Sequence, residues 1–307
     1  MGDKHTPVLL QESSQYLITK KNGVYFDGTL GFGGHSAMFL SLLNEEAKLI
    51  ATDVDEDAFS FCQDKFLGDS RVKLYRFNYS LIDLISKLEA LQGFDGIFAD
   101  LGVSSFQLDN PSSGFTFRAE ANLDLRMDKS KGLSAADIVN GFENFEIAKI
   151  LYEFGEEKNS RKISEKIVEF RKNKKISTTS ELVKIIEEIT PIPYINKTLM
   201  RVFQALRIYV NEELDHLDKF LKNAINLLNK DGRIVILTYH SLEDRIVKEN
   251  FKYETISCVC PKDFPICKCG KEVRLKLLTK KPIVPSMEEL NNNYRSRSAK
   301  MRVAQKL

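Results

Sequence analysis

The chain has 307 residues, of which 43% are hydrophobic and 29% are charged, and its net charge is +2 at pH 7. These proportions are typical of a soluble globular protein with two domains or one enlarged domain. No apolar run approaches the roughly 18 residues of a membrane-spanning helix, and the N-terminus lacks a signal-peptide core, so the sequence predicts a cytoplasmic protein. Five cysteines in a chain of this length exclude a disulfide framework.

Although the net charge is small, basic residues are concentrated in two segments of the chain. Residues 158–175 carry eight Lys or Arg against two Glu, and residues 271–307 carry ten against three. Either cluster could face the phosphates of a nucleic acid, and a solvated helix face or tail would explain either one equally well.

The first predicted element is a helix over residues 5–18, because Val8, Leu9 and Tyr16 recur at helical spacing after a Thr-Pro start. A short apolar strand at residues 24–26 follows it and runs into Asp27. We expect the helix to lie before this strand and to cover the edge at which a cofactor binds.

A glycine-rich turn, DGTLGFGGHS, joins this strand to a predicted helix over residues 35–43. Its four glycines are Gly28, Gly31, Gly33 and Gly34. They allow the backbone to adopt positive φ and to lie against a ligand. The run from Gly31 approaches the dinucleotide fingerprint G-x-G-x-x-G, but Asp27 would repel a pyrophosphate and attract the sulfonium and ammonium of S-adenosylmethionine. The turn therefore favours a methyl donor over a dinucleotide.

Strands and helices then alternate. Strands are predicted at residues 48–52, 71–77 and 94–101, and helices at residues 55–66 and 80–91. This alternation is typical of a doubly wound α/β fold with a parallel sheet, in which ligands bind at the carboxyl ends of the strands.

Polar residues follow each of these strands. Asp53, about 25 residues after the start of the glycine turn, is the expected acceptor of ribose hydroxyls. Asp55 is expected to cap the next helix. Tyr79 either flanks an adenine or packs in the core. Asp100, which precedes Gly102 and two serines, can accept hydrogen bonds from an amine nucleophile, unless this stretch only caps a helix.

The alternation stops over residues 107–204. A loop-like stretch there precedes helical patterns at residues 134–142, 145–154, 157–172 and 179–189. A connection of about a hundred residues is far longer than usual, so an inserted helical domain is predicted.

A further helical pattern, of one or two helices, covers residues 199–228, and a fifth strand is predicted at residues 232–238. His240 follows that strand. It either binds substrate or moves a proton in the same cleft, or it belongs to a helix cap with Ser241.

Four of the five cysteines form two C-x-C pairs, Cys258 with Cys260 and Cys267 with Cys269. Two close pairs of thiols resemble a zinc knuckle, although the spacing within each pair is tighter than the common C-x-x-C. Zinc ligands and reduced or redox-labile thiols are both open interpretations.

Longer motifs carry a resemblance to a known family. They are HTPVLL, DGTLGFGGHS, DLGVSS, SGFTFR with LDLRMD, RVFQALRI, VNEEL, YHSLEDRIVK and RSRSAKMRVA. Over essentially the whole chain they resemble the bacterial small-subunit ribosomal RNA methyltransferase H family, also called MraW. That family methylates the exocyclic N4 of a decoding-centre cytidine in 16S rRNA. The resemblance implies an S-adenosylmethionine-dependent enzyme that acts on 16S rRNA or the 30S subunit.

The resemblance also implies roles for individual residues. It places Gly33, Gly34 and His35 at the methionine end of the donor, Asp53 at the ribose, Tyr79 at the adenine, and Asp100 and Gln107 at the remaining donor contacts. Asp100 is the candidate catalytic group, with His240 as a second candidate. RNA is expected at Arg118, Arg126, Arg295, Arg297 and Arg302. The cysteine segment occurs in only part of the family, so the chemistry does not require it.

The sequence thus predicts a doubly wound, Rossmann-like class I methyltransferase fold with an inserted α-helical domain. The methyltransferase domain is expected at residues 1–106 and 206–307, and the substrate-recognition domain at residues 107–205. Two alternatives are a non-catalytic RNA-binding protein of ribosome assembly and a dinucleotide-dependent oxidoreductase.

Overall fold

The computed structural model describes residues 7–103, 114–261 and 266–307. The chain divides into two compact units: unit 1 comprises Met1–Gly102 and Leu214–Leu307, and unit 2 comprises Val103–Glu213. The second boundary lies after the expected position between residues 205 and 206. The reason is helix α10, Ile195–Val210, whose apolar side packs into the core of unit 2.

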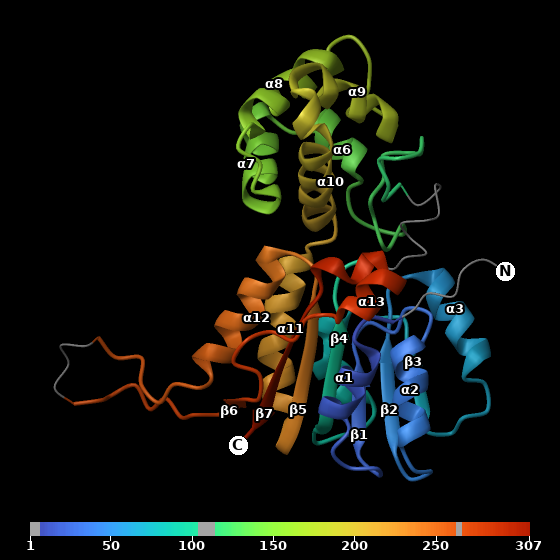
Figure 1. Ribbon diagram of the computed structural model, residues 1–307, viewed down its shortest axis with the longest axis vertical. Coiled ribbons are helices and arrows are strands. Elements are labelled where there is room, and N and C mark those ends of the chain that lie inside the picture. Colours follow the sequence, from blue (N-terminus) through green and yellow to red (C-terminus); the bar gives the residue numbers. More distant parts are fainter. Residues whose placement is uncertain (1–6, 104–113, 262–265) are drawn as a thin grey trace. The chain divides into compact units, whose positions relative to one another are not determined.

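Unit 1 is built on a seven-stranded sheet of order β3-β2-β1-β4-β5-β7-β6 (Figure 1). The strands are β1 Val24–Asp27, β2 Lys48–Thr52, β3 Val72–Tyr75, β4 Phe94–Asp100, β5 Leu228–Thr238, β6 Leu275–Leu277 and β7 Lys300–Lys306. Strands β1 to β5 are parallel, and β7 runs antiparallel to both β5 and β6. The strand order reverses between β1 and β4, which opens a crevice at their carboxyl ends. The predicted doubly wound fold is confirmed.

Strands β6 and β7 were not predicted. Their residues fall in the basic segment 271–307, which was expected to face phosphate or to form a solvated tail. Instead β7 buries Met301 and Val303 on one side and Ala304 on the other. Charged residues alternate with these apolar ones, so the segment looked basic although two parts of it, Leu275–Leu277 and Lys300–Lys306, pair in the sheet.

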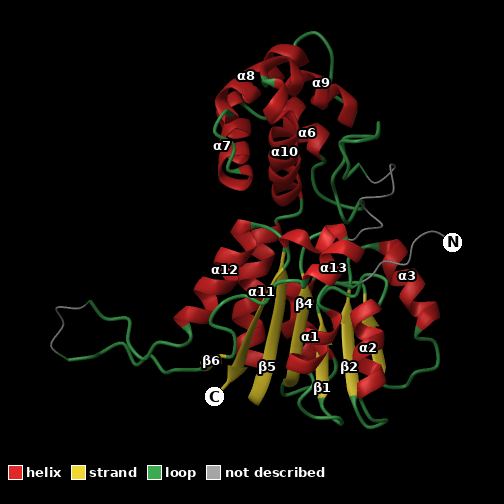
Figure 2. Ribbon diagram, in the orientation of Figure 1, coloured by secondary structure: helices red, strands yellow, loops and turns green. Residues whose placement is uncertain are grey.

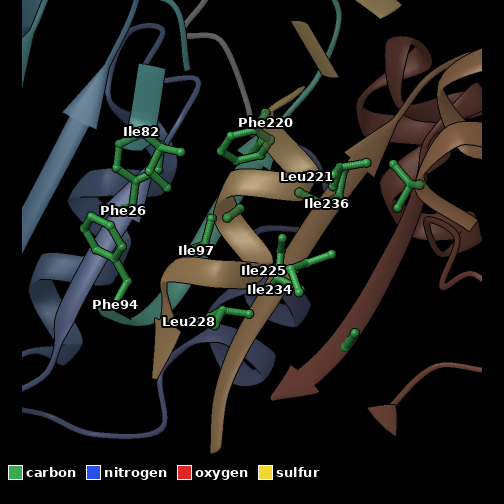
Figure 3. Packing of buried hydrophobic residues seen from close by; sticks show 14 of the residues in the cluster. Phe26, Ile82, Phe94, Ile97, Phe220, Leu221, Ile225, Leu228, Ile234 and Ile236 are labelled. Carbon is green, nitrogen blue, oxygen red and sulfur yellow. The ribbon is translucent and has the colours of Figure 1, made fainter. Parts of the chain in front are cut away.

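Helices cover both faces of the sheet (Figure 2). One face carries α1 (Leu10–Leu17), α2 (Gly34–Leu42) and α3 (Glu56–Lys65), and the other carries α4 (Ile82–Leu88), α11 (Glu213–Leu227) and α12 (Ser241–Tyr253). The side chains of neighbouring strand residues point to opposite faces of the sheet: Phe98 packs with α2, whereas Ile97 packs with α11. Figure 3 shows Phe220 and Ile225 of α11 beside Ile97 and Ile234 of the sheet.

The described residues of unit 1 also form a 3-10 helix at Tyr79–Leu81, α13 at Met287–Asn292 and a 3-10 helix at Tyr294–Ser298. The carboxylate of Glu289 in α13 accepts a hydrogen bond of 2.7 Å from the amide of Leu9. This contact fastens the start of α1 to the C-terminal part of the chain.

Unit 2 is helical and has a hydrophobic core of its own. The helices among its described residues are α6 (Ala135–Gly141), α7 (Asn144–Gly155), α8 (Ser160–Arg171), α9 (Thr179–Ile189) and α10, with a 3-10 turn at Ile192–Tyr194. Capping boxes begin α6 at Ser134 and α9 at Thr178. Of the helices in the described residues, none is both long and apolar enough to span a bilayer.

Candidate active site

Three aspartates stand at the carboxyl ends of neighbouring parallel strands. Asp27 ends β1, Asp53 follows β2 and Asp100 ends β4. Burial raises the pKa of Asp27 and of Asp53 to about 6, and that of Asp100 to about 7. Repulsion adds to these shifts, because Asp53 raises the pKa of Asp27 and Asp27 raises that of Asp100. Such a cluster of poorly hydrated carboxyl groups favours a cationic ligand.

The residues of the glycine turn hold two of these aspartates in place. The Asp27 carboxylate accepts hydrogen bonds from the amide of Thr29 at 3.1 Å and from the hydroxyl of Ser36 at 2.7 Å. The amide of Asp100 in turn donates to Oγ1 of Thr29 at 2.6 Å. Thr29 therefore ties the exit of β1 to the exit of β4.

Asp53 organises the glycine turn itself. Its Oδ2 accepts a hydrogen bond of 2.7 Å from the amide of Gly31, and its Oδ1 accepts one of 2.9 Å from the amide of Asp55. Gly33, the N-cap of α2, has φ of +68°, and a Cβ there would lie 2.7 Å from the ring of Phe66. The turn thus needs glycine both for its backbone conformation and for space.

Asp55 caps α3, as predicted. Its carboxylate accepts a hydrogen bond of 3.0 Å from the amide of Ala58.

Lys65 supports the same turn and was not predicted from the sequence. Its Nζ donates hydrogen bonds of 2.9 Å to the carbonyl oxygens of Phe32 and Gly33. A lysine in the last turn of a helix ordinarily stabilises the carbonyls of its own helix. No feature of the sequence marked Lys65 as a partner of a distant turn.

His35 and Gly34 lie against the segment that precedes α1. The Nε2 atom of His35 is 3.0 Å from the carbonyl oxygen of Val8, and its Nδ1 is 3.8 Å from Oδ2 of Asp100. A Cβ at Gly34 would lie 2.4 Å from Pro7. His35 therefore borders the aspartate cluster, and the contact of His35 and Gly34 with the methionine end of a donor stays a prediction.

Tyr79 lies after β3, where it was predicted either to flank an adenine or to pack in the core. Its ring meets Phe220 edge-on at a centroid distance of 5.0 Å, which is a core contact. A Cβ at Gly28 would lie only 2.9 Å from Cβ of Tyr79, so the residue also borders the glycine turn. Its contact with adenine stays a prediction. Gln107, the last predicted donor contact, lies outside the described residues.

His240 is the N-terminal cap of α12, so the cap interpretation holds for His240 itself rather than for Ser241. Its ring accepts a hydrogen bond of 3.4 Å from the amide of Glu243, whose carboxylate accepts one of 2.9 Å from the amide of Tyr239. The cap fixes the backbone of Tyr239, whose hydroxyl donates to Asp100. Tyr239 is a second site residue that was not predicted from the sequence.

Of the arginines expected to bind RNA, two are paired with carboxylates and three are exposed. Arg302 donates to Asp244 at 2.6 and 3.1 Å, and Arg126 donates to Asp124 at 2.6 and 3.0 Å. A guanidinium held by two bonds to a carboxylate has fewer donors left for phosphate. Arg118, Arg295 and Arg297 are exposed.

The four paired cysteines come together on the segment between α12 and β6, where their sulfur atoms all lie within 4.8 Å of one another.

The sequence of the chain is similar to those of known proteins. A sequence model described as the MraW methylase family matches residues 2–307. The chain belongs to this family. Two relatives, each named "Ribosomal RNA small subunit methyltransferase H", come from Caldicellulosiruptor saccharolyticus and from Clostridium botulinum strain Kyoto. The first is 45% identical over 305 residues, covering 99% of each chain, and the second is 48% identical over 309 aligned positions, covering 100% of each.

Solved structures also resemble the chain, at low similarity. A putative rRNA-methylase from Clostridium thermocellum shows 12% identity and a TM-score of 0.44, with 97% of this chain and 95% of that chain covered. SMU.1697c, a putative methyltransferase from Streptococcus mutans in complex with SAH, shows 13% identity and a TM-score of 0.42, with both chains fully covered. Membership of the MraW methylase family confirms the resemblance found in the motifs, and the chain is a methyltransferase by family.

Proposed function

We propose that this protein transfers a methyl group from S-adenosylmethionine to the exocyclic N4 amine of a cytidine in the decoding region of 16S rRNA, in the cytoplasm. The observation that carries the proposal is the cluster of Asp27, Asp53 and Asp100 around the glycine turn. The family and the printed name of the relatives support a ribosomal RNA of the small subunit as substrate. The cytidine N4 position rests on the resemblance of the motifs.

The charge of the cluster fits this donor and opposes a dinucleotide. S-adenosylmethionine carries a positive sulfonium and a positive ammonium, whereas NAD carries two negative phosphates. Two unit charges about 4 Å apart near a protein surface interact by about 4 kcal/mol, so the sign of the charge decides which ligand is favoured. Three carboxyl groups whose pKa values are raised by burial and by neighbouring carboxylates are stabilised in their ionised form by a cation.

Asp53 can hold the glycine turn and accept hydrogen bonds from the ribose of the donor at the same time. Each of its carboxylate oxygens accepts one backbone amide, and each has a second lone pair available for a ribose hydroxyl. Gly33 and Gly34 lie against the methionine end of the donor, and Tyr79 borders its adenine.

Asp100 is the proposed partner of the nucleophile. A cytidine amine is weakly nucleophilic because its lone pair is delocalised into the ring, so positioning and the exclusion of water contribute more than a strong base would. S-adenosylmethionine, when bound, supplies an electrophilic methyl group. With a pKa of about 7, Asp100 is partly ionised at neutral pH and can accept the proton that the amine loses as its nitrogen gains the methyl group.

We assign substrate recognition to unit 2 and to exposed basic residues. The target base must leave its stack to reach a buried site, so the RNA backbone has to be held nearby. Arg161 and Lys162 on α8 are exposed, as are Arg118, Arg295 and Arg297. Arg126 and Arg302 are left out of this assignment because carboxylates already hold them.

The test combines donor binding with product mapping. Calorimetry with S-adenosylmethionine and with NAD should show binding of the methyl donor alone. Incubation with 30S subunits from a strain that lacks the enzyme should then yield one methylated cytidine, located by mass mapping of 16S rRNA. Binding of neither ligand would support the assembly-protein alternative, and methylation at another base or atom would refute the proposed position.

A further inference from the structure

Between α12 and β6 the chain makes a long excursion that contains no helix or strand in its described residues (Figure 1). Three apolar side chains among its described residues are largely outside any core: Val259, Ile266 and Val273 are 44%, 70% and 38% exposed. A short segment without a core needs another source of stability, such as a disulfide or a metal ion.

The base of the excursion is firmly closed. The guanidinium of Arg274 donates to the carboxylate of Glu254 at 2.6 Å through Nη2, and Lys271 donates to the same carboxylate at 2.9 Å. The amides of Arg274 and Leu275 both donate to the carbonyl oxygen of Glu254, at 2.9 and 3.1 Å. The segment therefore leaves the fold and returns to it at a fixed point, and only its outer part needs support.

In that outer part four sulfur atoms are brought together. The Sγ separations are 4.0 Å between Cys260 and Cys267, 3.4 Å between Cys267 and Cys269, and 4.0 Å between Cys269 and Cys258. Four thiolates arranged tetrahedrally at about 2.3 Å from a zinc ion stand about 3.8 Å apart. The four sulfurs thus have the spacing of a tetrathiolate metal cage.

The backbone around the cage supports thiolate ligands. The amide of Val259 points at Sγ of Cys269 at 3.5 Å, and the amide of Cys260 points at Sγ of Cys258 at 3.4 Å. Hydrogen bonds to ligand sulfurs orient them and stabilise their negative charge. Gly270, next to Cys269, has φ of +60° and allows the chain to turn directly after the second pair.

We propose that Cys258, Cys260, Cys267 and Cys269 bind one structural zinc ion that stabilises the excursion between α12 and β6. All four ligands come from the protein, so no coordination position is open for water or substrate, and the site is structural rather than catalytic. The inference is independent of the proposed methylation, in which the cysteine segment has no part.

Zinc fits the site better than its competitors do. A disulfide would require sulfurs about 2.05 Å apart, well below every separation seen here. Tetrahedral thiolate sites select zinc or iron among the common metals, and hard cations such as magnesium prefer oxygen ligands. Iron is therefore the competing metal that the test has to distinguish.

The test measures metal directly, in the full-length protein purified without chelators. Elemental analysis should give about one zinc per chain. Replacement by cobalt should give the visible absorption of a tetrahedral tetrathiolate site. Trypsin should cleave after Lys268 much faster once zinc is removed, whereas affinity for S-adenosylmethionine should change less than twofold.

Cysteine variants distinguish the proposed zinc ligands from a cysteine outside the cluster. Cys260→Ser and Cys267→Ser should each lose most of the zinc, and Cys62→Ser, which removes a buried thiol outside the cluster, should keep it. Circular dichroism shows whether each variant is folded. Iron in place of zinc, a protein mass lowered by disulfide formation, or four freely titrating thiols without metal would each overturn the proposal. Failure to bind the methyl donor would count against the proposed function and leave this result unaffected.

Discussion

The hydroxyl of Tyr239 donates a hydrogen bond of 2.7 Å to Oδ1 of Asp100 and so joins the end of β5 to the end of β4. This bond lowers the pKa of Asp100, but burial raises it by more, and the carboxyl group titrates at about 7. Glu243 holds the amide of Tyr239 within the cap of α12. Tyr239 is therefore placed to set both the orientation of Asp100 and its charge at neutral pH.

Tyr239→Phe should shift the pH dependence of methylation. Loss of the hydroxyl donor removes a contact that favours the ionised carboxylate, so the pKa of Asp100 should rise further, by roughly one unit. The acid limb of a single-turnover rate profile should move to higher pH by that amount, with much of the activity recovered at alkaline pH. An equal loss of rate at every pH would show that Tyr239 has only a structural role.

Asp100→Asn keeps the shape of the side chain and removes its charge. Turnover should fall by about 100-fold or more if the charge contributes roughly 3 kcal/mol in the transition state. RNA affinity should stay within a few fold, since other residues are assigned to the RNA. Single-turnover methylation and RNA binding measured side by side decide this: near-normal methylation would remove Asp100 from the chemistry, and lost RNA binding would recast it as a docking residue.

Donor affinity should rise with pH. In the unfolded chain Asp27, Asp53 and Asp100 ionise near pH 3.8, whereas in the fold they stay protonated up to about pH 6 to 7. The folded state therefore binds more protons between about pH 4 and 7, and without a ligand its free energy of unfolding falls as pH rises through this window. A cationic donor favours the ionised carboxylates, so its binding should tighten over the same window.

Calorimetric titration with S-adenosylmethionine at pH 5, 6, 7 and 8 measures this effect. Affinity should increase by up to about tenfold per pH unit below the pKa for each carboxylate that must ionise. Thermal unfolding of the ligand-free protein at the same pH values should show the opposite trend, and Asp100→Asn should reduce both slopes. Donor affinity that is independent of pH would mean that these carboxyl groups do not face the donor's positive charges.

The sequence predicted the parts of this site that follow from local rules. Asp27, Asp53 and Asp100 each end or follow an apolar strand, and parallel strands bring such ends to one edge of the sheet. Lys65 and Tyr239 could not be found in this way, because their partners lie far away in the chain. The structure alone shows which distant groups meet.

The C-terminal strands escaped prediction for a different reason. In β7, Arg302 stands between Met301 and Val303, and the segment around it is basic. The positive charge of Arg302 is paired with the carboxylate of Asp244 on α12, a partner that no sequence pattern identifies. A pattern of alternating charged and apolar residues therefore fits an edge-proximal strand and a nucleic-acid-binding tail equally well until the pairing is known.

Gly33→Ala should destabilise the protein and weaken donor binding. Alanine at the φ of +68° costs about 1 to 2 kcal/mol, and its Cβ would also meet the ring of Phe66 at 2.7 Å. Gly68→Ala is a matched control, because Gly68 also has positive φ but has open space around it. Urea denaturation should show a larger loss for Gly33→Ala, and only that variant should bind S-adenosylmethionine less tightly. Equal losses in the two variants would show that the crowding at Gly33 is relieved by movement of Phe66.

The basic residues of unit 2 allow a test of RNA contact by salt dependence. Among the described residues, Arg161 and Lys162 of α8 form no ion pair, whereas Lys166 pairs with Glu169 and Glu188, and Lys174 pairs with Glu181. A cation that contacts phosphate releases a counterion, so its removal lowers the slope of log affinity against log salt by about one. Arg161→Ala and Lys162→Ala should each do so.

Lys166→Ala and Lys174→Ala are the matched controls, since each removes the same charge from a lysine already held by carboxylates, and they should leave the slope nearly unchanged. Binding to a 16S rRNA fragment measured at four salt concentrations gives all the slopes. If all four variants lowered affinity alike, the effect would be that of net charge alone. If Arg161→Ala and Lys162→Ala had no effect, the RNA would have to be held elsewhere, and the exposed Arg118, Arg295 and Arg297 would be the next residues to replace.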